Sequence, residues 1–70
     1  MRWRLEACRV QAKMTQREVA DALGISEATL INYEKGRTAV RIERAQELSA
    51  LYGIPLDLMD FSKLGNREVG

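Results

Sequence analysis

Few side chains in this sequence are suited to covalent or metal-assisted chemistry. The 70 residues include no histidine and a single cysteine, Cys8. Asp57 and Asp60 have the spacing that places two carboxylates on one helical face, but no set of further metal ligands accompanies them. Cys8 falls in an apolar stripe, so we interpret it as a buried small side chain rather than a nucleophile. We therefore expect no enzymatic activity, no metal and no cofactor.

A more distinctive spacing of polar residues lies in the middle of the chain, where it indicates two short helices joined by a tight turn. Thr15 and Glu18 have the spacing of a capping box, in which each side chain bonds to the backbone amide of the other residue. Gly24 can adopt the left-handed conformation that commonly ends a helix. Ser26 can cap the second helix, and Gly36 can end it.

In the second of these helices, apolar and polar side chains separate. Leu30 and Tyr33 point to one side. The residues that point elsewhere are Glu27, Ala28, Ile31, Asn32 and Lys35. Two helices, a short glycine turn and a second helix with an exposed, mixed polar face form the helix-turn-helix pattern.

The sequence around this pattern resembles the XRE/Cro-type, lambda-repressor-like family of DNA-binding domains. The resemblance extends over nearly the whole chain, up to Phe61. The residues that carry it are Thr15-Gln16, Val19-Ala20, Leu23-Gly24-Ile25-Ser26, Thr29-Leu30, Tyr33-Glu34 and Gly36-Arg37, with Leu5, Arg9, Leu48, Gly53 and Leu56-Asp57 outside the motif.

Helical spacing predicts three further helices outside the motif. The first runs over Arg2–Ala12, the fourth over Ile42–Tyr52, and a short fifth over Pro55–Phe61. Together with the resemblance, this spacing predicts an all-α, compact five-helix lambda-repressor-like domain over residues 1–61, with the helix-turn-helix at helices 2 and 3. Residues 62–70 lack helical periodicity and are interpreted as a flexible C-terminal tail.

The resemblance implies that the third helix reads the major groove of double-stranded DNA through Glu27, Ala28, Ile31 and Asn32. Glu27 can accept a hydrogen bond from a cytosine amino group, and Asn32 can form a bidentate pair with an adenine edge. Ala28 and Ile31 offer apolar surface suited to a thymine methyl. A bidentate pair contributes roughly 1–3 kcal/mol of discrimination between bases.

Residues that flank the third helix are expected to contact the phosphate backbone. Gln16 begins the second helix, where its side chain and the free amides can meet a phosphate oxygen. The other candidates are Arg17, Lys35, Arg37 and Thr38, and Arg41 and Arg44 could join them. We rank Gln16, Arg37 and Thr38 above Arg17, Arg41 and Arg44, since several of these charges could simply be solvated.

Composition and charge are consistent with this interpretation. With 46% hydrophobic and 30% charged residues, the sequence is typical of a globular domain. The single cysteine excludes an internal disulfide and suits a reducing, cytoplasmic setting. No apolar run approaches the roughly 20 residues of a membrane span. The net charge is only +1, but Lys and Arg outnumber Asp and Glu in residues 1–44, where the motif lies.

Two structural roles are also implied by the resemblance. Arg9 is expected to pair with Glu34 and so to pin the first helix to the end of the third. Lys13 stands where the family usually has glycine, so the first helix either ends differently or places Lys13 in the left-handed conformation, at a cost of about 1 kcal/mol. Lys13 could also present its ammonium group to a phosphate.

Members of the resembled family usually bind as two-fold homodimers, with half-sites of a palindromic operator about one helical turn apart. Leu58, Phe61 and Leu64 are candidate dimer contacts, although the same three side chains could close the core of the monomer. Trp3 either caps the core near the amino terminus or lies against a partner subunit.

The resulting hypothesis is a sequence-specific DNA-binding transcriptional regulator, most simply a repressor, with no small-molecule ligand evident. The alternative is a protein–protein interaction module or antitoxin-like regulator on the same fold. An exposed Ile31 and the near-neutral total charge suit that alternative.

Overall fold

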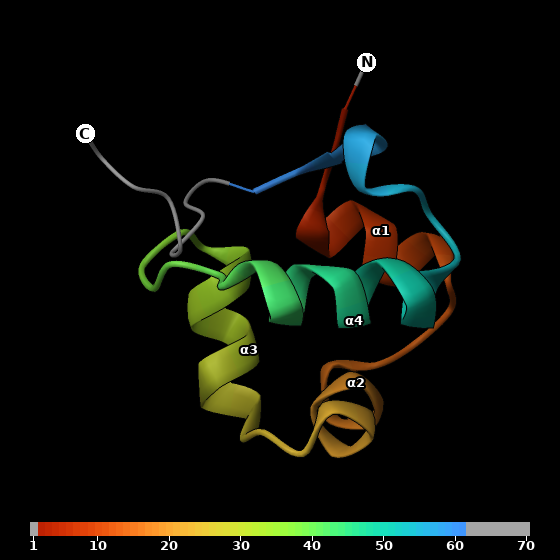
Figure 1. Cartoon of the computed structure of the whole chain (residues 1–70). Helices are drawn as coiled ribbons and strands as arrows, with labels where there is room; N and C mark the ends of the chain where they lie inside the picture. The colour runs from red at the N-terminus through yellow and green to blue at the C-terminus, as the bar shows by residue number, and fades with distance from the viewer. Residues whose placement is uncertain (1, 62–70) are drawn as a thin grey trace, which may run out of the picture.

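The computed structural model describes residues 2–61, and within them four α-helices account for most of the ordered structure (Figure 1). The elements in chain order are β1 (Trp3–Arg4), α1 (Leu5–Gln11), α2 (Gln16–Leu23), α3 (Glu27–Glu34), α4 (Ile42–Tyr52), the one-turn 3-10 helix η1 (Leu56–Leu58) and β2 (Met59–Asp60). The helix α2 packs against α3, and α1 contacts both α3 and α4. No helix in the described part of the chain has the length and apolar composition needed to cross a membrane.

The helices of the motif begin where their capping residues predict. The Thr15 side chain accepts from the Glu18 amide at 3.1 Å, and the Glu18 carboxylate accepts from the Thr15 amide at 2.9 Å. This confirms the predicted capping box at the start of α2. Ser26 caps α3 by accepting from the amide of Thr29 at 3.1 Å.

The ends of α1, α2 and α3 share one backbone arrangement, the Schellman motif. After α2, the amides of Gly24 and Ile25 donate to the carbonyls of Asp21 and Ala20, and Gly24 has the left-handed φ of 72°. After α1, Lys13 takes the same place with a φ of 60°, so a lysine adopts the conformation that glycine adopts after α2.

A single core lies between the helices. Its largest fully buried side chains are Leu30, Leu48, Val19, Val40 and Cys8. Burying one leucine side chain contributes roughly 1.5–3 kcal/mol, so a domain of this size depends on each of these positions. Cys8 is buried, as its place in an apolar stripe predicts.

The predicted fifth helix is wrong. Only one 3-10 turn forms, closed by a bond from the Leu58 amide to the Pro55 carbonyl at 3.0 Å. The chain then extends, because Met59 pairs with Trp3 in a parallel two-stranded sheet and its side chain enters the core. The described part of the chain therefore has four α-helices rather than five, and its fold is mostly helical.

The same pairing corrects the start of the first helix. Trp3 and Arg4 are extended in β1, so α1 begins at Leu5 rather than at Arg2. Trp3 is 38% exposed and lies outside the buried core cluster of the described residues. The predicted tail, residues 62–70, lies outside the described residues.

Candidate nucleic-acid interface

The helix α3 is anchored from one side and leaves its amino-terminal turn exposed. Leu30 is completely buried against the core, and Tyr33 packs partly against it. Glu27 and Ala28 are exposed, whereas Ile31 and Asn32 are partly buried. Of the four residues expected to meet bases, two therefore have exposed side chains, and the other two expose only part of theirs to solvent.

The loop after α3 is folded back onto the helix that precedes it. Gly36 has a φ of 73°, and the amides of Arg37 and Thr38 donate to the carbonyl of Asn32 at 2.9 and 3.4 Å. Arg37 and Thr38 are both exposed. The backbone thus holds these two candidate phosphate contacts at the carboxyl-terminal end of α3, one turn from Asn32.

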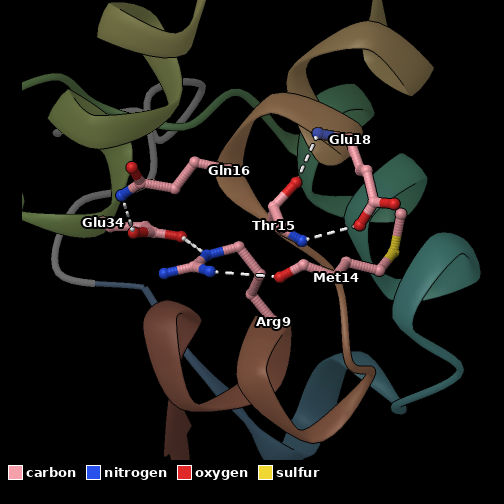
Figure 2. Close-up of polar contacts among 6 residues, drawn as sticks. All are labelled: Arg9, Met14, Thr15, Gln16, Glu18 and Glu34. Carbon is pink, nitrogen blue, oxygen red and sulfur yellow. Dashed lines mark hydrogen bonds and ion pairs between the residues drawn. The ribbon is translucent and has the colours of Figure 1, made fainter.

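Arg9 and Glu34 form an ion pair that connects α1 to the end of α3 (Figure 2). The Arg9 Nε donates to Glu34 Oε2 at 2.7 Å, and the two side chains are only 12% and 5% exposed. Arg9 Nη1 also donates to the Met14 carbonyl at 3.1 Å. The pair therefore joins three segments: α1, the loop before α2, and α3.

The structure gives Gln16 a contact that the sequence did not suggest. Its Nε2 donates to Glu34 Oε1 at 3.2 Å, so one of the two donors of the amide expected to meet a phosphate bonds to a carboxylate (Figure 2). Arg17 and Lys35 are exposed and make no ion pair with the residues in 2–61. No spacing rule would have revealed the contact, because 18 residues separate Gln16 from Glu34.

Arg44 makes two hydrogen bonds within the protein. Its Nη1 donates to the Leu23 carbonyl at 3.2 Å and to Glu47 Oε1 at 2.6 Å. The guanidinium thus satisfies a carbonyl at the carboxyl-terminal end of α2, a role that sequence analysis missed. Arg41 is exposed, with its Nε 3.9 Å from Glu43 Oε1.

Tyr52 lies buried on α4, and its surroundings raise its pKa. Burial raises the pKa of the phenol well above its ordinary value, the Glu34 carboxylate adds to the rise, and Arg9 opposes it. Burial likewise raises the pKa of the Cys8 thiol. Among residues 2–61, the Tyr52 hydroxyl has no hydrogen-bond partner.

Apolar side chains remain exposed on a different part of the surface. Trp3, Val10 and Leu58 are the large hydrophobic residues that are exposed among those described, and Trp3 borders shallow hollows lined by α1 on one side and by residues 53–58 on the other. Of the three candidate dimer contacts, Leu58 is exposed and Phe61 packs partly against the core. Leu64 lies outside the described residues.

Comparison with known proteins places this arrangement in a family. The helix-turn-helix family model matches residues 5–59. A relative, the cryptic phage CTXphi transcriptional repressor RstR of Vibrio cholerae, is 35% identical over 48 residues, which cover 69% of this chain and 43% of the relative. The matched segment is thus less than half of that protein, and no solved structure matches the chain significantly. The chain belongs to the XRE/Cro-type helix-turn-helix family of DNA-binding domains.

Proposed function

We propose that this chain binds double-stranded DNA sequence-specifically and regulates transcription as a repressor, with α3 in the major groove. The observation that carries the proposal is the first turn of α3: it is capped by Ser26, anchored by buried Leu30 and free to solvent at Glu27 and Ala28. A rigid helix with an exposed amino-terminal turn is what entry into the major groove requires. The repressor role is supported by the similarity to a phage transcriptional repressor.

Base reading is assigned to Glu27, Ala28, Ile31 and Asn32. Glu27 and Asn32 supply the hydrogen bonds, to a cytosine amino group and an adenine edge, while Ala28 and Ile31 supply apolar contacts to a thymine methyl. Glu27 also repels phosphate, which disfavours tight non-specific binding. Asn32 is partly buried, so its side-chain amide must extend outward from the surface of α3 to reach a base.

Backbone contacts are assigned to five residues around this helix: Gln16, Arg17, Lys35, Arg37 and Thr38. Arg37 and Thr38 have the strongest structural support, because their backbone is fixed to the end of α3 while their side chains are exposed. Such contacts set the register of the protein on the duplex without carrying sequence information.

One α3 helix reads only a few base pairs, so we propose a two-fold dimer on a palindromic operator. Leu58 is the best-supported of the three candidate dimer contacts because it is exposed beside Trp3. Phe61 packs on the monomer's own core and is a weaker candidate.

Selection of bound duplexes from random DNA tests this function. The proposal predicts a two-fold symmetric motif with half-sites one helical turn apart. On the selected site, Asn32→Ala should relax the preference at one base pair, whereas Arg37→Ala should weaken all sequences alike and reduce the salt slope by about 1. An Asn32→Ala variant that weakens every sequence equally would remove that residue from base reading.

The second candidate function is binding of a protein partner, and the exposed Trp3, Val10 and Leu58 favour it. A salt titration separates the two functions. DNA binding should weaken steeply as salt is added, because bound phosphates release counterions. Absence of DNA binding, or binding insensitive to salt, would favour the protein partner.

A further inference from the structure

We propose that Glu34 is a positioning residue for DNA binding, which holds the Gln16 side chain in place at the start of α2 before a phosphate arrives. The inference deepens the proposed function and rests on it. It assigns to the ion pair at the end of α3 a role beyond pinning helices together.

The geometry places one carboxylate between two donors from different segments. Glu34 Oε2 accepts from Arg9 Nε at 2.7 Å, and Glu34 Oε1 accepts from Gln16 Nε2 at 3.2 Å (Figure 2). Arg9 is itself fixed by its bond to the Met14 carbonyl. With its side chain 5% exposed, Glu34 has little freedom to turn away from either donor.

This contact determines which end of the Gln16 amide faces outward. A carboxylate only accepts hydrogen bonds, so the amide nitrogen of Gln16 must face Glu34. One of the two N–H groups is used by Glu34, and the other remains for a second acceptor. A phosphate oxygen is such an acceptor, and Gln16 is only partly buried.

Positioning matters because a glutamine side chain is otherwise mobile. Immobilising one flexible side chain on binding costs an amount that corresponds to roughly three- to tenfold in affinity. In this protein the Gln16 side chain is ordered when the chain folds, so its loss of conformational entropy does not reduce the affinity for DNA. Glu34 therefore affects affinity for DNA without touching it.

The test separates positioning from stability. A buried ion pair can often be replaced by apolar side chains without loss of stability, so we choose the double variant Arg9→Met/Glu34→Met, which also leaves the net charge unchanged. Gln16→Ala is made in the wild-type and double-variant backgrounds, with Gln46→Ala, an exposed glutamine on α4, as the matched control. The probe is a short double-stranded DNA of mixed sequence at low salt, since a phosphate contact does not depend on sequence.

We expect the double variant to fold, by circular dichroism, and to bind the duplex roughly three- to tenfold more weakly than the wild type. Gln16→Ala should weaken the wild type but have little further effect in the double variant, and Gln46→Ala should change neither. Wild-type affinity in the double variant, or an equal effect of Gln16→Ala in both backgrounds, would overturn the proposal. A wild type that binds neither this duplex nor any duplex selected from random DNA would instead overturn the proposed function.

A measurement on the wild type alone keeps the inference testable if the double variant does not fold. Relaxation of the side-chain amide of Gln16 by NMR reports its order in the free protein. The proposal requires an ordered amide before DNA is added and little further ordering afterwards. A Gln16 amide as mobile as that of Gln46 would contradict it.

Discussion

The substitution Gly24→Ala tests the turn between α2 and α3. Gly24 has φ 72° and ψ 32°, and a Cβ added there would meet nothing within 4 Å. The cost is therefore backbone strain alone, about 1–2 kcal/mol for a left-handed L residue. Part of it is offset, because alanine has less freedom than glycine in the unfolded chain, by about 0.4–1 kcal/mol. We expect a net loss of between zero and about 1.6 kcal/mol in the free energy of unfolding.

The chain contains a matched control for this substitution. Gly53 ends α4 with φ 70° and ψ 30°, and an added Cβ again meets nothing within 4 Å. Gly53→Ala should therefore cost the same amount. Lys13 offers the reverse experiment, because it already has a φ of 60° at the end of α1. Lys13→Gly should relieve strain and leave stability equal to or up to about 1.6 kcal/mol above that of the wild type.

Urea unfolding followed by circular dichroism measures all three variants at 25 °C. Each kcal/mol shifts the Tm of a domain of this size by about 4–8 °C, so thermal melts should resolve the differences. Duplex binding well below the Tm should persist in Gly24→Ala and Gly53→Ala, because neither substitution changes a residue assigned to DNA contact. A cost for Gly24→Ala that exceeds the cost for Gly53→Ala by several kcal/mol would contradict a purely local strain, and so would a Lys13→Gly variant less stable than the wild type.

Three further substitutions and one pH series test which side chains the core buries. Tyr52→Phe removes a buried hydroxyl that has no hydrogen-bond partner in residues 2–61, so it should raise the free energy of unfolding by about 1 kcal/mol. A lower Tm in this variant would mean that the hydroxyl makes a hydrogen bond. Burial raises the pKa values of Cys8 and Tyr52 in the folded protein above their ordinary values of 9.0 and 10.0. The stability that these two groups contribute is therefore complete below pH 9, and it falls as the pH rises through their pKa values in the folded protein. In urea titrations, the loss above pH 10 should be smaller in Tyr52→Phe, and an equal loss would contradict the assignment. Leu30→Ala, at a fully buried site, should lower the free energy of unfolding by about 2–5 kcal/mol. Val10→Ala, at a 60% exposed site, should change it by no more than about 0.5 kcal/mol. Denaturant midpoints measure both, and similar costs would contradict the burial pattern.

The features that sequence could predict are those set by residues close together in the chain. The capping box of Thr15 and Glu18, the cap at Ser26 and the left-handed Gly24 all involve partners within a few positions. Each of these short-range preferences agrees with the final fold, and for this reason the sequence alone predicts the helix-turn-helix.

What sequence could not predict depends on distant partners. Met59 is extended rather than helical because it pairs with Trp3 at the other end of the chain, and the apolar spacing of a short segment fits either conformation. Arg44 bonds to the Leu23 carbonyl across 21 positions, so its place in the sequence gives no sign of this contact. Likewise, the bond between Gln16 and Glu34 became visible only with the fold.

Chemical-shift mapping by NMR during addition of a selected duplex identifies the residues that meet the DNA. If α3 and the turn behind it form the DNA-binding surface, the largest changes should fall on Glu27, Ala28, Asn32 and Arg37. The chemical shifts of Trp3 should change less than those of these four residues, because Trp3 lies beside the proposed dimer contact Leu58 rather than at the DNA. Changes concentrated around Trp3, with none along α3, would contradict the account.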